Sequence, residues 1–600
     1  MENKNNWCLI IINFVCAFST LLIIYWVLKF SAYGIDFTDE GFYLNSISNP
    51  FLYKTSIAHF SFIYHPFYNL VDGNIVWLRR LNVIISFTLS FALTYFLINK
   101  IIEKEKINRI FYIIISIGIS TYVLSTMYMQ TPNYNSLNFQ GLLLTCIGLV
   151  LIDEKNFNKN FVAHIVIGLG GWLTFMAKPT SALGLAIITS IYLFLSKNFR
   201  WRFILVSIFT SIILLILTAF IIDGSISLFF DRYVVSLELQ SLLQSGHGLN
   251  KIFRIDSFNL SRKIKYLIFF IFLFFLFFIF FEIKNYKIID FLKIFITFLI
   301  FLTIIILTLF DINLNPNLGE YRSYILFGII FAFVFLNIFF IIKKKIEINE
   351  IKWSIFILFL VLPYVFALGT NNNNWIQSGL ASFFWLIASL TIIIPTFLKF
   401  HKKIFIIFFV LISQLITSVH IKERMEKPYR YNEPLRLSES KIYVDNKYYL
   451  KLSKEFSNYI NDFRNIVTQS GFKKKDPVID LSGQSPTLVY LMNGKSIGTA
   501  WNIGGYKGSL NLAKAKFDLV NCKEISNAWF ILEIKGRRSI STELLNYLGA
   551  DFPNQYQLMG SWKTAKGAGG YKNPRKQELY KPVNTKLIFD SCNEKRKQNN

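Results

Sequence analysis

Thirteen long apolar segments run through the first 420 residues, and they restrict this chain to one class of fold. A helix needs about 20 apolar residues to cross a bilayer, and only helices or closed barrels satisfy their backbone groups there. The segments lie at residues 8–30, 82–99, 110–128, 136–152, 161–177, 180–196, 203–222, 265–281, 289–310, 322–342, 353–368, 378–398 and 403–420. The sequence therefore predicts a polytopic α-helical membrane protein with about thirteen transmembrane helices.

The first and fifth segments each leave a choice. Residues 8–30 are too long and unbroken for a cleavable signal peptide, so we expect a retained first helix. Only Lys178 and Pro179 separate the fifth segment from the sixth, so this pair is either two spans or a re-entrant pair.

The basic residues predict the orientation of these helices. The net charge is +27, and much of the basic excess lies in short loops between apolar segments, which is typical of membrane topology rather than of nucleic-acid binding. Basic residues cluster at 100–109, 197–202, 343–345 and 399–403, whereas 130–135, 311–317 and 369–375 are almost free of them. We expect the basic loops and the N-terminus to be cytoplasmic. An odd number of spans then places residues after 420 outside.

Three regions are expected outside the membrane. Two are loops at about 31–81 and 223–264, the second with a helical pattern, and the third is the segment 421–600, which has the mixed polarity and size of a soluble domain. Short apolar runs predict strands at 477–481 and 528–532, and polar–apolar patterns predict helices at 449–470, 485–492 and 541–548. We therefore divide the chain into a transmembrane domain, 1–420, and an extracytoplasmic α/β domain, 421–600.

The cysteines and histidines predict little chemistry. Cys522 and Cys592 are the only two cysteines of the extracytoplasmic domain, where an oxidising compartment permits a disulfide. Spacing alone leaves that disulfide open, because bonding requires the two Cβ atoms to meet. The six histidines show no metal-ligand spacing, so neither a metal site nor a cofactor is expected.

Two adjacent carboxylates, Asp39 and Glu40, follow the first apolar segment closely. One interpretation is a solvated helix start, because acids favour a helix N-terminus. The other is a reactive site, because His65 follows in the same loop and Arg79 and Arg80 open the next span. An acid and two guanidinium groups at one membrane face suit an anionic, lipid-linked substrate.

These residues follow a known order of motifs. Asp39-Glu40 is followed by a small residue and Tyr43, then by His65-Pro66, by Arg80-Leu81, and by Phe175-Met-Ala-Lys-Pro179. The order resembles that of GT-C glycosyltransferases, most of all the branch of protein O-mannosyltransferases and lipid A aminoarabinose transferases. The resemblance covers mainly the first 180 residues, the helix count and the outward C-terminal domain. The chain departs from it in lacking a glycine after Lys178 and in carrying Phe67 after Pro66.

The resemblance implies transfer of a sugar from a polyprenyl-phosphate carrier, such as undecaprenyl phosphate, to an acceptor hydroxyl outside the membrane. It implies Asp39 as the general base that activates the acceptor, with inversion at the sugar by analogy with inverting glycosidases. Glu40 would orient Asp39 or accept a second hydroxyl, and which of the two carboxylates is the base stays open. No Asp-x-Asp motif stands in the first loop, so we expect a metal-independent enzyme.

Candidate substrate contacts follow from the same reasoning. Arg80, Lys178 and Arg79 are expected to hold the donor phosphate, with Arg80 preferred over Arg79 because it precedes Leu81. For the arginines the alternative is snorkelling to the membrane interface. His65, Tyr43, Asn133, Tyr134 and Asn135 are candidate sugar contacts, although Asn also forms turns.

The amino-acid composition indicates where such an enzyme would act. Richness in Asn, Ile and Lys is typical of an AT-rich bacterial genome, so we expect a bacterial inner-membrane enzyme acting on O-antigen of lipopolysaccharide, on lipid A or on protein. The expected partners are a lipid-linked sugar, a glycan or lipid acceptor and membrane lipids, but no nucleic acid. A transporter or polymerase of polysaccharide or lipid-linked sugar is the alternative.

Overall fold

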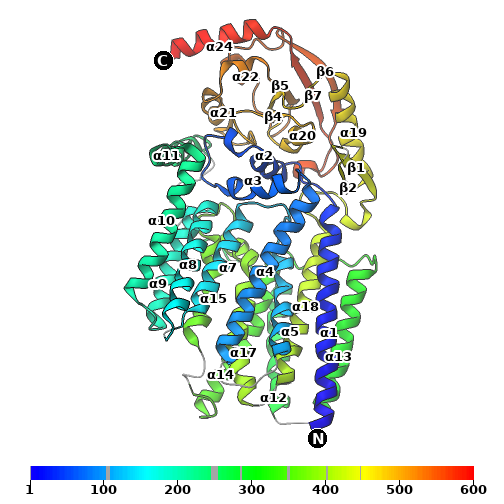
Figure 1. The fold of residues 1–600 in the computed structure, drawn as a ribbon. Helices are drawn as coiled ribbons and strands as arrows, with labels where there is room; N and C mark the ends of the chain where they lie inside the picture. Colours follow the sequence, from blue (N-terminus) through cyan, green and yellow to red (C-terminus); the bar gives the residue numbers. More distant parts are fainter. Residues whose placement is uncertain are drawn as a thin grey trace.

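The structure is a computed structural model of the chain, and it describes residues 2–102, 109–153, 155–244, 254–283, 287–347, 352–400, 403–445 and 447–599. A bundle of long helices carries an α/β domain at one end, here called the domain end (Figure 1). The bundle comprises α1 Glu2–Lys29, α4 Ile75–Ile102, α5 Arg109–Ser120, α6 Tyr122–Thr126, α7 Tyr134–Leu151, α8 Phe157–Ala177, α9 Pro179–Leu195, α10 Trp201–Asp223, α12 Arg262–Ile283, α13 Lys287–Leu309, α14 Leu326–Ile342, α15 Trp353–Ala367, α16 Asn374–Ser378, α17 Phe383–Lys399 and α18 Lys403–Glu426.

Each predicted apolar segment is largely helical, but not every one is long enough for a full span. Within the described ranges, ten helices are long and apolar enough to cross a membrane, or eleven if α16 and α17, bent by 61°, count as one. Helices α9 and α15 are apolar but only 17 and 15 residues long. Pro179 starts α9 and separates it from α8, because proline has no N–H to continue the α8 helix. The count of thirteen crossings stays a prediction.

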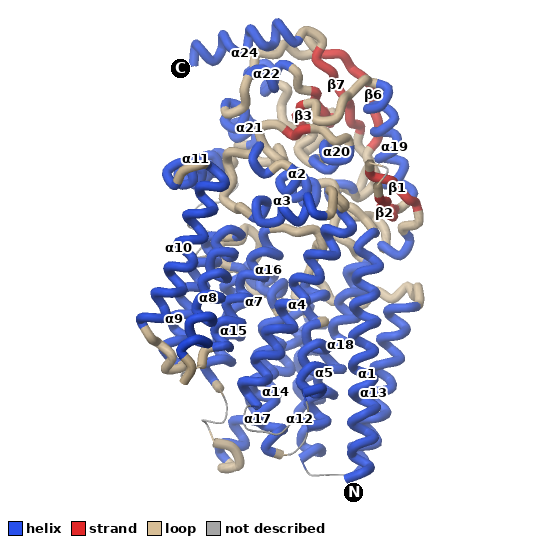
Figure 2. The backbone as a smooth tube through the Cα atoms, in the orientation of Figure 1, coloured by secondary structure: helices blue, strands red, loops and turns tan. Residues whose placement is uncertain are grey.

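Short helices cover the domain end of the bundle. These are α2 Asp39–Ser48, α3 Phe60–Leu70 and α11 Ile226–Leu242, and they lie between the bundle and the α/β domain (Figure 2). The helix expected within 223–264 is therefore present over the span of α11. Residues 245–253 of that region lie outside the described residues.

The C-terminal domain is built on a mixed five-stranded sheet. Its strand order is β4-β3-β5-β7-β6, with β3 parallel to β4 and β5, and β7 antiparallel to β5 and β6. The strands are β3 Pro477–Asp480, β4 Lys495–Ser496, β5 Trp529–Glu533, β6 Tyr556–Lys563 and β7 Lys576–Pro582. The two strands predicted from sequence are confirmed as β3 and β5. Predicted helices at 485–492 and 541–548 correspond to α20 Pro486–Leu491 and α23 Glu543–Tyr547.

One predicted helix boundary is wrong. Residues 448–452 form β2, which pairs antiparallel with β1 Ser440–Val444, and helix α19 begins only at Lys454. The side chains of β2 alternate between buried and more exposed positions, which is the period of a strand rather than of a helix. Ser453 then caps α19 by accepting a hydrogen bond from the Phe456 N–H.

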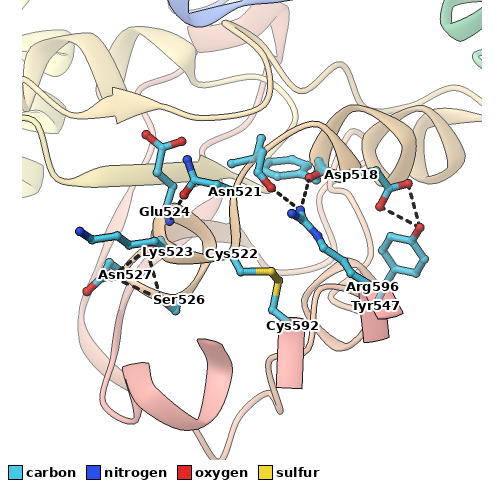
Figure 3. Close-up of a disulfide and its surroundings, with 12 residues drawn as sticks. Asp518, Asn521, Cys522, Lys523, Glu524, Ser526, Asn527, Tyr547, Cys592 and Arg596 are labelled. Atoms are coloured by element: carbon cyan, nitrogen blue, oxygen red, sulfur yellow. Dashed lines mark hydrogen bonds between the residues drawn. A yellow bond between two sulfur atoms is a disulfide. The ribbon is translucent and has the colours of Figure 1, made fainter. Parts of the chain in front are cut away.

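A disulfide joins the end of the chain to this domain. Cys522, at the start of α22 Cys522–Ser526, is bonded to Cys592 in α24 Thr585–Asn599, with an S–S distance of 2.06 Å (Figure 3). The bond that sequence left open is thus present in the structure.

The α/β domain is fixed to the first loop of the bundle. Asn45 of α2 donates to the Pro486 carbonyl at 2.9 Å, and the Thr487 hydroxyl donates to the Asp36 carbonyl at 2.7 Å. A Cβ atom on Gly41 would lie 2.2 Å from the Thr487 nitrogen, so α2 and α20 pack at a distance that only glycine permits. The carboxylate motif on α2 is therefore placed by both domains.

The two ends of the bundle should lie on opposite sides of a membrane. Single cysteines replacing Asp551, exposed in the α/β domain, and Lys344, exposed at the opposite end, should label from opposite sides of sealed spheroplasts with an impermeant maleimide. The reason is that Lys-rich loops stay cytoplasmic. The unsubstituted protein is the control for labelling of native cysteines. Labelling of both sites from one side would contradict this topology.

Candidate active site

Helix α2 begins at the carboxylate motif because Asp36 caps it. The Asp36 Oδ2 accepts hydrogen bonds from the backbone N–H groups of Thr38 and Glu40, each at 3.2 Å. Burial, together with the nearby charge of Asp39, raises the pKa of Asp36 to about 7. The cap thus places Asp39 and Glu40 in the first turn, with their side chains in different surroundings.

Glu40 is enclosed by an ion pair with Arg79. The Glu40 Oε1 accepts hydrogen bonds from Arg79 Nη2 at 2.7 Å and Nε at 3.0 Å, and the Thr131 hydroxyl also donates to it. Arg79 donates its remaining N–H groups to backbone carbonyls, including those of Ser31 at 2.8 Å and Gly34 at 3.0 Å. Both side chains are almost fully buried. Glu40 and Arg79 therefore satisfy each other and serve to join the first loop to α4.

Asp39 is the more accessible carboxylate, with 21% of its side chain exposed. Its Oδ2 accepts a hydrogen bond from the Tyr429 hydroxyl at 2.7 Å and lies 3.4 Å from Arg430 Nη1. Burial, with the charge of Asp39, raises the pKa of Tyr429, so the phenol remains a hydrogen-bond donor. Asp39 Oδ1 makes no hydrogen bond to any residue that the structure describes, which leaves it available to a substrate.

Three further tyrosines surround this carboxylate. The Tyr43 hydroxyl lies 3.0 Å from that of Tyr128, whose ring meets Tyr429 edge to face at 5.7 Å. The Tyr134 ring packs edge to face on Tyr43 at 6.0 Å. The structure thus brings two sequence candidates, Tyr43 and Tyr134, to the surroundings of Asp39, and it adds Tyr128 and Tyr429.

A cavity of about 390 Å³ lies beside this group at the domain end of the bundle. Part of its lining is the first loop with Glu40 and Arg79, and another part comes from Glu320 and Arg322, which precede α14, and from the end of α18. The lining residues are Val27, Phe30, Tyr33, Gly34, Ile35, Asp36, Glu40, Arg79, Leu124, Met127, Tyr128, Met129, Gln130, Glu320, Arg322, Ile421, Arg424, Met425, Lys427, Pro428, Tyr429, Tyr431 and Leu435. The cavity therefore combines carboxylates, guanidinium groups and apolar side chains.

Two arginines of the cavity wall have unused hydrogen-bonding capacity. Arg424 donates from Nη2 to the Thr126 carbonyl at 3.0 Å, but its Nε and Nη1 are buried and have no hydrogen-bond partner among the described residues. Arg322 is held only loosely, with Nη1 3.5 Å from Glu423 Oε2. Buried donors without a partner are costly, so an anion in the cavity would stabilise this arrangement.

Neither Arg322 nor Arg424 is among the site residues predicted from sequence. We ended the last apolar segment at residue 420, whereas α18 continues to Glu426. Ile421 and Met425, four residues apart, are both buried in the bundle, and this spacing was the available signal that the helix continues.

Two predicted phosphate ligands, Arg80 and Lys178, and one predicted sugar contact, His65, lie elsewhere. The Arg80 guanidinium stacks on the ring of Trp77, 4.7 Å from its centre, and Lys178 donates to the Phe366 carbonyl at 3.3 Å. His65 bonds through Nδ1 with the Ile47 carbonyl at 2.7 Å. None of the three is among the described residues that line the cavity.

Asn133 and Asn135 lie just behind the cavity wall. The Asn133 side chain caps α7 by accepting hydrogen bonds from the Asn135 and Ser136 N–H groups. Asn133 therefore stabilises the start of this helix. Both asparagines line a second, much smaller cavity, of about 30 Å³, which shares Met127, Tyr128 and Met129 with the larger one. A sugar contact by these amides stays a prediction.

Within the described part of the chain, no group of three or more His, Cys, Asp or Glu residues is arranged to hold a metal ion. No protein-family model matches the chain, and a search of curated proteins finds no match. The resemblance to GT-C glycosyltransferases therefore stays a prediction, and the functional argument depends on the geometry of the site.

The Glu40–Arg79 pair should be essential to the fold. Glu40→Gln should lower the free energy of unfolding in detergent micelles by about 3–5 kcal/mol, because it leaves a buried guanidinium without its counter-ion. Adding Arg79→Met should recover part of that loss. The control is Asp72→Asn at the Asp72–Lys447 pair, whose side chains are 80% and 51% exposed, where about 0–1 kcal/mol is expected. If Glu40→Gln and Asp72→Asn lowered the free energy of unfolding equally, this role of the Glu40–Arg79 pair would be contradicted.

Proposed function

We propose that this chain is an integral membrane glycosyltransferase that moves a sugar from a polyprenyl-phosphate donor to an acceptor hydroxyl. One observation carries the proposal. At the domain end of the bundle, a partly exposed carboxylate, Asp39, accepts a hydrogen bond from Tyr429 of a cavity that is also lined by Arg322 and Arg424. Arg322 is held at 3.5 Å by Glu423, and Arg424 has two buried nitrogens without a hydrogen-bond partner among the described residues. A base and an anion site at one membrane boundary are what this reaction requires.

Asp39 is assigned as the general base. An acceptor hydroxyl becomes an effective nucleophile when a positioned base takes its proton as the new glycosidic bond forms. Asp39 Oδ1 is free for this, whereas Glu40 is enclosed by Arg79, Thr131 and the Asp36 N–H. A single base acting opposite the leaving phosphate would give inversion at the sugar.

Arg322 and Arg424 are assigned to the phosphate that leaves. Guanidinium groups bind phosphate oxygens through charge-assisted hydrogen bonds, and the Nε and Nη1 of Arg424 have no acceptor among the residues that the structure describes. Apolar residues of the same cavity, such as Phe30, Ile421 and Met425, would accompany the first isoprene units of a lipid carrier. We therefore assign phosphate binding to Arg322 and Arg424 in place of Arg80 and Lys178, the residues predicted from sequence.

The proposed location is the outer side of the bacterial inner membrane. The Cys522–Cys592 disulfide is favoured in an oxidising compartment. The Lys-rich turn at 343–345 is at the opposite end of the bundle, with the chain N-terminus (Figure 1), as the positive-inside rule requires. The acceptor would be a surface glycan such as O-antigen, or lipid A or protein.

Asp39→Asn should abolish transfer while leaving the fold intact. In proteoliposomes supplied with a panel of purified undecaprenyl-phosphate sugars and lipopolysaccharide, we expect a rate loss of about 100-fold or more, because the base is removed. Asp72→Asn, at an exposed acid, is the control and should retain activity. Unchanged transfer by Asp39→Asn would contradict the assigned base. Movement of intact lipid-linked sugar across the bilayer, with no transfer by the wild type, would favour a transporter.

Arg424→Gln should weaken binding of the sugar donor and leave binding of the acceptor unchanged. Loss of a charge-assisted hydrogen bond is worth about 1.5–3 kcal/mol, so we expect an increase in the donor KM on the order of 10–100-fold. Arg80→Gln is the matched control, because Arg80 stacks on Trp77 outside the cavity, and it should change the donor KM less than about twofold. The reverse pattern would assign the phosphate to Arg80.

A further inference from the structure

Helix α11 follows the membrane helix α10 after a sharp turn. α10 ends at Asp223, Gly224 adopts the left-handed conformation with φ of 75°, and Ser225 caps α11 by accepting from the Leu228 N–H. Glycine permits this φ without strain. Figure 1 shows α11 lying across the domain end of α10. The start of α11 is therefore within two residues of the end of an apolar span.

α11 has an exposed apolar stripe. Ile226, Phe230, Val234 and Leu237 have exposed fractions of 41%, 61%, 52% and 59%. Their spacing of four, four and three residues places them on one face of the helix. Acidic Asp231 and Glu238 are exposed on the flank of this stripe, whereas Arg232 is buried on the other side.

The buried face of α11 is fixed, so the helix cannot rotate to hide the stripe. Arg232 Nε donates to Asp223 Oδ2 at 2.8 Å, and the Tyr233 hydroxyl lies 2.9 Å from His59 Nδ1. At its other end, the Leu243 carbonyl accepts the Gly508 N–H of the α/β domain at 3.3 Å. α11 therefore has contacts with the bundle, the first loop and the α/β domain.

We propose that α11 is an interfacial membrane helix whose stripe inserts at the boundary between lipid headgroups and acyl chains. The stripe continues a lipid-facing surface of the bundle, because Leu217, Phe220 and Ile221 of α10 have exposed fractions of 54%, 54% and 70%. Amphipathic helices with bulky apolar side chains on one face bind bilayers in this way. The flanking acids then remain in water.

This position would set the height of the α/β domain above the membrane. The contact with α11 is close, because a Cβ atom on Gly508 would lie 1.7 Å from the Leu242 carbonyl oxygen. A helix fixed in the interface thus holds the α/β domain at one distance from the bilayer surface. The inference is independent of the proposed reaction, since it depends only on α10, α11 and Gly508.

Spin labels test directly whether the apolar stripe of α11 lies in lipid, in water or against protein. Nitroxides are placed on single cysteines replacing Phe230, Val234 or Leu237, with Ile221→Cys as the lipid reference and Glu238→Cys as the water reference. The full chain is reconstituted in vesicles of phosphatidylethanolamine and phosphatidylglycerol. Power saturation with oxygen and with a water-soluble nickel chelate should show the three stripe labels accessible to oxygen and protected from nickel, as at residue 221. Glu238→Cys should show the reverse.

Two results would overturn the proposal. Stripe labels as accessible to nickel as the label at 238 would place the stripe in water. Stripe labels protected from both reagents would place it against protein, either a partner or a second copy. Three separate label sites guard against the failure of one variant to fold, and the unlabelled parent reports any signal from native cysteines.

Discussion

The arrangement of the site depends on the buried ion pair between Glu40 and Arg79. This pair connects the first turn of α2 to the second turn of α4. The same guanidinium donates hydrogen bonds to the carbonyls of Ser31 and Gly34, just after α1 ends. A buried pair of this kind is costly to break because each charge depends on the other. With Glu40 paired to Arg79, the preceding residue, Asp39, instead accepts a hydrogen bond from Tyr429, which lines the cavity.

The site is assembled from both ends of the sequence. Asp39 is contributed by the first loop, while its partners Tyr429 and Arg430 follow the last membrane helix, and Thr487 of the α/β domain bonds the first loop from above. Arg322 and Arg424 close the other wall. The α/β domain is thus part of the site's framework, because it adds hydrogen bonds to the first loop and to α2.

The sequence predicts the helices better than the site. Apolar length reveals the long bundle helices, because a span requires about 20 apolar residues, but it does not reveal short helices such as α6 and α16. The conspicuous Asp39-Glu40 pair reveals the first loop, from which Glu40 lines the cavity. The sequence does not show which of Arg79 and Arg80 is buried in the bundle. Neighbouring residues lie about 100° apart around a helix, so only one of the two can point inward, and packing decides which. The guanidinium groups of Arg322 and Arg424 meet only through packing of helices that lie about 100 residues apart in the chain.

In the proposed reaction, the cavity lined by Tyr429, Arg322 and Arg424 receives the phosphate of a lipid carrier. The most direct measurement is an electron cryomicroscopy structure of the protein in nanodiscs saturated with undecaprenyl phosphate. We expect phosphate density within hydrogen-bond distance, about 3 Å, of both Arg322 and Arg424. Phosphate density beside Lys178 or Arg80, with the cavity free of lipid, would contradict it.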